Sequence, residues 1–223
     1  MEVGKKVLYD RIEQRELPKR FQLCYCFFAF VTRFFTFISL FFPLLLLSLD
    51  GFCQPEGELG ILGGMGSEAT VLFYKKIIDK TSVNNDREHL DILIYNHASI
   101  PDRTECILCG KQDYLWDIIA KDIRGMEQLG CEYFAIPCNT CHYFADRLQE
   151  LTNGKFINMI EETARYASER GRKKVGVMAT DGTVKGGMYK KALEKYGIEV
   201  VYPSEERQKD VMSLIYEQIK RGE

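Results

Sequence analysis

Apolar and polar residues follow two different patterns along this chain, and the change between them falls near residue 57. Beyond that point, short apolar runs alternate with longer segments in which apolar residues recur every three or four positions. Short runs of this kind are typical of buried strands, and the longer segments are typical of amphipathic helices. We predict strands at 59–63, 91–96, 131–137, 156–160, 174–179 and 199–202, and helices around 68–82, 112–129, 140–151, 161–170, 184–196 and 205–220.

The regular alternation of strands and helices predicts an α/β fold with parallel sheets and right-handed crossovers. Both faces of such a sheet are covered by helices, which explains why the apolar runs are continuous. Ligands then bind beyond the carboxyl ends of the strands. Met65, Arg103, Cys138 and Thr180 all follow strand candidates closely. We therefore expect them to share one site.

The N-terminal region has a different character. Residues 1–20 are rich in charge, and residues 21–49 are almost wholly apolar, with Gln22 and Arg33 as the strongly polar exceptions. A turn-rich joint follows at residues 50–57. Three interpretations stay open: a membrane anchor in contact with a bilayer through 21–49, a signal sequence, or translated upstream sequence that the working protein lacks.

Composition narrows the functional classes. The chain has 223 residues, enough to bury a core, and a formal net charge of -2, so no affinity for nucleic acid is indicated. Its eight cysteines show no regular disulfide framework, which favours reduced thiols and a cytoplasmic location for the part after residue 57.

The segment Ala135–His142, with the sequence Ala-Ile-Pro-Cys-Asn-Thr-Cys-His, carries the clearest chemical signal. It joins a predicted buried strand to a predicted helix, so Cys138 stands where unpaired backbone N–H groups favour an anion. Such a setting lowers the pKa of a thiol and makes a thiolate available. Asn139 and Thr140 can donate hydrogen bonds to a carboxylate. The segment therefore predicts a reactive thiol beside an anion site.

Residues 136–142 resemble the signature of the aspartate/glutamate racemase family, whose members racemise amino acids without a cofactor. Further segments resemble the family in the same order along the chain. They are 60–66, 100–103, 159–163, 178–183 and 215–222. The resemblance covers residues 58–223. It implies two similar parallel-sheet lobes that face each other across a cleft, the second one incomplete, and a homodimer.

The resemblance places the lobes at residues 58–154 and 155–223 and implies a small amino acid as substrate. Cys138 matches one of two family cysteines, which remove and return the Cα proton on opposite faces. Asn139, Thr140 and the backbone N–H of Cys141 would hold one carboxylate.

Arg103 and Lys220 would grip the other carboxylate, and the arginine fork suits a bidentate contact. Met65 and Thr180 are further candidates for contact with the substrate. Thr183, beside Thr180, is a further donor. An N-capping role explains either threonine hydroxyl equally well.

One departure from the family pattern is large. The second family cysteine lies in a Gly-Cys-Thr-Glu segment, and no Gly-Cys-Thr occurs in this sequence. The resemblance therefore predicts a C-terminally truncated racemase with impaired proton transfer. An inactive protein that still binds amino acids is the alternative.

Other motifs allow other functions. The loop 64–69 fits the G-x-G-x-x-A dinucleotide fingerprint, which would suit a nicotinamide-dependent oxidoreductase, although the same backbone N–H groups accept any anion. Ser67 in this loop is a candidate N-cap. Residues 138–142 match a haem-attachment string, and Cys106, Cys109, Cys138 and Cys141 could in principle bind zinc. The strand-to-helix setting disfavours both, and we expect no cofactor and no metal.

Overall fold

The computed structural model describes residues 58–220, so the predicted apolar segment 21–49 lies outside the described residues. In chain order the elements of the first part are β1 (Glu58–Gly63), α4 (Ser67–Lys80), η1 (Asp86–Glu88), β2 (Ile92–Asn96), α5 (Arg103–Leu108), α6 (Gln112–Gln128), β3 (Cys131–Ala135), η2 (Asn139–Phe144), α7 (Ala145–Leu151) and β4 (Lys155–Ile157). They are followed by α8 (Met159–Glu169), β5 (Lys174–Gly176), α9 (Asp181–Gly186), α10 (Met188–Glu194), β6 (Glu199–Val201), α11 (Glu205–Ser213) and η3 (Leu214–Ile219).

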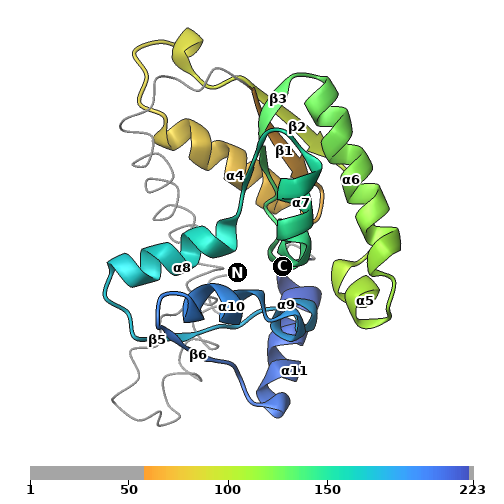
Figure 1. The fold of residues 1–223 in the computed structure, drawn as a ribbon, viewed down its shortest axis with the longest axis vertical. Helices are drawn as coiled ribbons and strands as arrows, with labels where there is room; N and C mark the ends of the chain where they lie inside the picture. The colour runs from red at the N-terminus through yellow and green to blue at the C-terminus, as the bar shows by residue number, and fades with distance from the viewer. Residues whose placement is uncertain (1–57, 221–223) are drawn as a thin grey trace.

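Two parallel sheets organise the described chain, as Figure 1 shows. The first sheet has the strand order β2-β1-β3-β4, and the second pairs β5 with β6. All pairings are parallel. The prediction of an α/β fold with parallel sheets is therefore confirmed.

Strand β1 lies in the middle of the first sheet and is covered on both faces. Leu59 and Ile61 pack with Ile77 of α4, whereas Leu62 packs with residues of α6. Because successive side chains of a strand point to opposite faces, a continuous apolar run is what two covering helices require. In Figure 1, α4 and α6 lie on either side of this sheet.

The second sheet has a core of its own. Val175 of β5 packs with Ile160 of α8, Leu193 of α10 and Ile198. Helices α11 and η3 form a smaller cluster around Val211 and Ile215. The segment η3 is a π-helix near the end of the described chain. Tyr216 in η3 and Lys220 just after it contact Asp102, the residue that caps α5.

Three local differences from the prediction have clear causes. Residues 103–108, for which the sequence pattern predicts no element, form helix α5, because the Asp102 side chain accepts a hydrogen bond from the Glu105 N–H and caps it. The strand expected at 156–160 ends at Ile157, because Asn158 caps α8 in the same way. Strand β4 pairs with β3, so the first sheet extends three residues past the expected lobe boundary.

No helix within residues 58–220 combines the length and the apolar character that crossing a bilayer requires.

Candidate active site

Cys138 lies just beyond the carboxyl end of β3, on the residue that caps the helical segment η2. Its backbone is extended, with φ -142° and ψ 110°, and its side chain is partly exposed. Backbone N–H groups at the start of a helical segment have no partner within it and favour negative charge. The sequence prediction of a thiol at a strand-to-helix junction is thus confirmed in its location.

The pKa of the Cys138 thiol lies well below its ordinary value. The largest cause is a hydrogen bond from the thiol of Cys141, and the positive charge of Arg103 acts in the same direction, while burial opposes both. Cys141 is fully enclosed, and its own pKa is raised because it donates to Cys138 and because it is buried. Both shifts favour a proton on Cys141 and a thiolate on Cys138.

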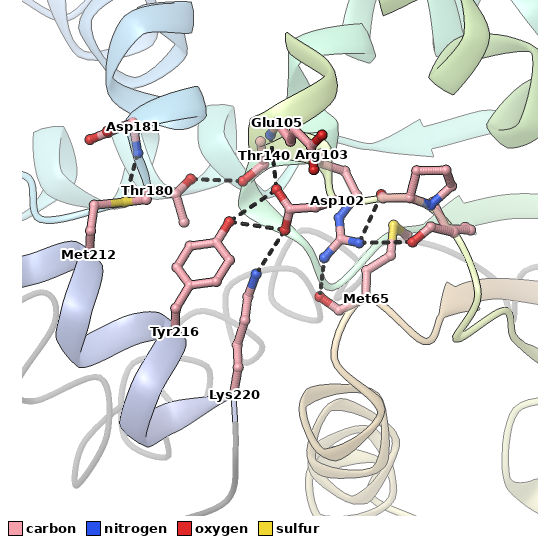
Figure 2. Close-up of polar contacts among 12 residues, drawn as sticks. Met65, Asp102, Arg103, Glu105, Thr140, Thr180, Asp181, Met212, Tyr216 and Lys220 are labelled. Atoms are coloured by element: carbon pink, nitrogen blue, oxygen red, sulfur yellow. Dashed lines mark hydrogen bonds and ion pairs between the residues drawn. The ribbon is translucent and has the colours of Figure 1, made fainter. Parts of the chain in front are cut away.

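Arg103 begins α5 and is buried, with 9% of its surface exposed. Its terminal nitrogens donate to the carbonyl oxygens of Ile100 (3.3 Å), Pro101 (3.1 Å) and Met65 (3.2 Å). Figure 2 shows the guanidinium held against these loops. Its buried Nε has no hydrogen-bond partner among residues 58–220. Burial opposes the charge, yet the neighbouring Cys138 raises the pKa of Arg103.

Asp102, the residue before Arg103, caps α5 and contacts two side chains near the end of the described chain. Its carboxylate accepts from the hydroxyl of Tyr216 at 3.0 and 3.1 Å and from the ammonium of Lys220 at 3.4 Å. The Lys220 nitrogen also lies 3.7 Å from the centre of the Tyr216 ring. Figure 2 shows both side chains reaching Asp102 from the same helix. Burial lowers the pKa of Lys220, with Asp102 opposing that shift.

Three threonine hydroxyls meet where the two parts of the chain touch. Thr140 of η2 lies 3.0 Å from the hydroxyl of Thr180 and 3.1 Å from that of Thr183. Thr180 also caps α9, by accepting from the Thr183 N–H. Gly182 allows this approach, because a Cβ at that position would stand 3.0 Å from the Cα of Thr104.

Asn139 makes a second contact between the two parts. Its amide oxygen accepts a 2.6 Å hydrogen bond from the hydroxyl of Tyr189 on α10. Because the oxygen is engaged, the NH2 group is what Asn139 can offer a carboxylate.

His142 makes hydrogen bonds to the backbone on either side of the site, at Cys138 and at Met159. Its Nδ1 lies 2.9 Å from the carbonyl oxygen of Cys138, and its Nε2 accepts from the N–H of Met159 at 3.2 Å. Those contacts require a neutral ring with its proton on Nδ1. Burial lowers the pKa of His142 to about 4, against the opposing effect of its hydrogen bonds to the backbone. His142 therefore ties the backbone of Cys138 to the first turn of α8.

The loop between β1 and α4 closes one side of the site. Met65 is buried, and its sulfur lies 3.1 Å from the Cys141 sulfur. Gly64 has a positive φ of 87°, and its N–H donates to the hydroxyl of Thr70. The expectation that Ser67 caps α4 is wrong: Gly66 stands at the cap, and the Ser67 hydroxyl accepts from Asn96 instead.

The structure thus brings the predicted residues together around Cys138. Thr140 and Thr180 are joined by a hydrogen bond. Lys220 contacts Asp102, the residue before Arg103, and its charge interacts with those of Asp102 and Arg103. Sequence reasoning missed the remaining supports, His142, Tyr189, Asp102 and Tyr216. The last two lie inside the segments 100–103 and 215–222 and could have been found there, whereas the contacts of the first two are visible only in the fold.

Among residues 58–220, no three His, Cys, Asp or Glu side chains gather in a way that could hold a metal ion. The four-cysteine zinc arrangement considered from the sequence does not form there.

Comparison with known proteins decides the family. The model of the Asp/Glu/Hydantoin racemase family matches residues 62–223 of this chain. The chain belongs to the Asp/Glu/Hydantoin racemase family. The resemblance noted in the sequence is therefore confirmed.

Individual members of the racemase family agree with this assignment. The chain is 28% identical over 148 residues to the broad specificity amino-acid racemase RacX of Bacillus subtilis, covering 65% of this chain and 63% of RacX. The chain thus spans less than two thirds of the length of that relative. The fold resembles the aspartate racemase of Picrophilus torridus (TM-score 0.66, 32% identity, 74% of this chain and 69% of that chain). It also resembles an aspartate racemase homologue from Pyrococcus horikoshii (TM-score 0.59, 26% identity, 74% and 73%).

Proposed function

We propose that this chain is a cofactor-independent racemase of aspartate, glutamate or a similar amino acid, in which Cys138 exchanges the Cα proton. The proposal is carried by the partly exposed Cys138 at the carboxyl end of a central strand, where Cys141 and Arg103 lower the pKa of its thiol. A base must be deprotonated at the working pH to accept a weakly acidic proton. The lowered pKa of Cys138 meets that condition.

The groups around Cys138 suit a substrate that carries two carboxylates. Thr140, the NH2 group of Asn139 and the backbone N–H of Cys141 are donors on one side. Arg103 and Lys220 add positive charge on the other. The names of the relatives, an aspartate racemase and a broad specificity amino-acid racemase, support an amino-acid substrate.

Lys220 would have to exchange partners when a substrate binds. Its ammonium rests against Asp102 at 3.4 Å, a length that indicates a weak ion pair. A substrate carboxylate of the same charge can replace Asp102, because Tyr216 still donates to Asp102. We therefore expect Lys220 to move between these carboxylates, while Met65 and Thr180 line the site.

Two-sided proton transfer needs a second base, and residues 142–223 contain no cysteine. Cys138 alone would serve one face of Cα. We therefore expect Cys138 to exchange a proton on that face without efficient inversion. The alternative, a protein that binds amino acids without any exchange, rests on the same observation. A homodimer, a cytoplasmic location and a membrane contact through 21–49 stay predictions.

Hydrogen exchange at Cα separates these alternatives. The chain is incubated in heavy water with aspartate or glutamate and no added cofactor, and mass spectrometry follows deuterium at Cα. The proposal expects label that disappears in Cys138→Ser and persists in the matched control Cys109→Ser, whose thiol is exposed and outside the site. Binding without label favours the alternative. Label that needs a nicotinamide contradicts the proposal.

A further inference from the structure

Cys138 and Cys141 form a dithiol pair on one side of a tight turn. Cys138 is the extended residue that caps η2, and Cys141 is the third residue of that 3₁₀ segment. The Cys141 thiol already hydrogen-bonds to the Cys138 sulfur. A disulfide requires Cα atoms about 4.4–6.8 Å apart, and a cap residue and the third residue of the helical segment it caps lie within one turn of each other.

The two sulfurs sit in unequal surroundings. Cys138 is partly exposed, so a small oxidant reaches it from solvent, whereas Cys141 has 0% of its surface exposed. Cys141 is enclosed against the Met65 sulfur at 3.1 Å. An exposed thiolate reacts first with peroxide, and a second thiol next to it resolves the product. The pair has this division between an attacking and a resolving sulfur.

We propose that hydrogen peroxide converts Cys138 and Cys141 into a reversible disulfide. The Cys138 thiolate attacks one peroxide oxygen, the O–O bond breaks, and hydroxide leaves as Cys138 becomes a sulfenic acid. Cys141 then loses its proton to that hydroxide, which becomes the first water. The Cys141 sulfur attacks the Cys138 sulfur as the S–O bond breaks, and the second hydroxide leaves and takes a proton from solvent to become the second water. The two thiols lose two electrons and two protons, and peroxide is reduced to two waters. A small dithiol reverses the step by exchange.

The consequence for activity rests on the proposed function, because a disulfide sulfur cannot accept a proton from Cα. Oxidation would stop Cα exchange, and reduction would restore it. Formation of the disulfide itself does not depend on that function. A measurement of mass alone therefore tests the inference even if the chain proves not to be a racemase.

The tryptic peptide of residues 125–147 reports the reaction directly, because it contains Cys131, Cys138 and Cys141. The full chain is treated with peroxide, unfolded, alkylated with iodoacetamide and digested. Without peroxide the peptide should carry an alkyl group on each cysteine. After peroxide it should carry one, on the buried Cys131, and its alkylated mass should rise again after dithiothreitol. Full alkylation after peroxide, or a bond to Cys131, would overturn the inference.

A kinetic comparison shows whether the fold activates the pair. At pH 6.5, lowering a thiol pKa from 9.0 to about 6 raises the thiolate fraction more than it lowers the reactivity of each thiolate, a net gain of about tenfold. The disulfide should therefore form about ten times faster in the folded chain than in urea. Equal rates would mean that sequence proximity alone brings the sulfurs together.

Two variants complete the test. In Cys141→Ser, the sulfenic acid on Cys138 has no resolving partner, so dimedone should trap it and no disulfide should form in the peptide. In the matched control Cys131→Ser, the disulfide should form as in the unmodified chain. A disulfide in Cys141→Ser, or its loss in Cys131→Ser, contradicts the assignment of Cys141 as the resolving sulfur.

Discussion

Replacing Arg103 by glutamine should raise the pKa of Cys138 and make the thiol less reactive at neutral pH. The guanidinium is the positive charge that stabilises the Cys138 thiolate, and it is buried, so solvent screens the interaction weakly. Glutamine keeps hydrogen-bond donors near the carbonyl oxygens of Pro101 and Met65 but removes the charge. The change therefore isolates the electrostatic contribution.

The size of the effect follows from the structure. With a pKa of about 6, roughly ten thiolates exist for every thiol at pH 7. Loss of an adjacent opposite charge moves a pKa by about 1–3 units. A rise of about two units would leave about one thiolate for every ten thiols.

The assay is the rate of iodoacetamide alkylation at Cys138 between pH 5 and 9, resolved by mass spectrometry of the peptide of residues 125–147. Arg103→Lys, which keeps the charge, should retain most of the lowered pKa. Arg207→Gln removes an exposed arginine paired with Asp210 and serves as the matched control. Circular dichroism checks that each variant folds. An unchanged alkylation profile in a folded Arg103→Gln protein would refute the electrostatic argument.

Two further predictions concern buried His142 and the close approach of Gly182 to Thr104 and Thr140. His142 has a folded-state pKa of about 4 against 6.5 when unfolded, so the unfolded chain binds more protons between these values, and stability should fall by up to about 3 kcal/mol as the pH drops from 6.5 to 4. Urea unfolding at pH 7 and 4.5 measures this, and His142→Gln should lose that part of the pH dependence; equal dependence in both proteins would count against it. Gly182→Ala should destabilise by about 1–3 kcal/mol, because its Cβ would crowd Thr104 and Thr140. Gly125→Ala, which meets nothing within 4 Å, is the control and should be neutral or slightly stabilising.

The fold was accessible from sequence wherever short-range signals were strong. The continuous apolar run at residues 131–135 predicted a buried strand, and β3 occupies it. Helix α5 was missed because it has only six residues and follows Pro101, so its apolar pattern is too short to predict a helix. The pairing of β4 with β3 was missed because a strand of three residues has little pattern of its own.

The residues of the candidate site also fall into two groups, those that local sequence predicts and those that only the fold reveals. Cys138 and its neighbours could be found from sequence because strand, cap and helix follow one another locally. The contact of Tyr189 with Asn139 spans 50 residues, and that of Tyr216 with Asp102 spans 114. Nothing in the local sequence of either tyrosine reports its distant partner. Such contacts depend on how the two sheets pack, so they became visible only in the structure.

The central claim is that Cys138 exchanges the Cα proton from one face. In the most direct measurement, L- and D-aspartate are incubated separately with the 223-residue chain in heavy water. The enantiomers are then separated, and mass spectrometry measures the deuterium in each. The account predicts that one enantiomer gains deuterium without inversion and that the other stays unlabelled. Cys138→Ser should abolish the label, because a serine hydroxyl is too weakly acidic to lose its proton near pH 7 and so provides no base. Rapid labelling and inversion of both enantiomers, or labelling that survives in Cys138→Ser, would contradict it.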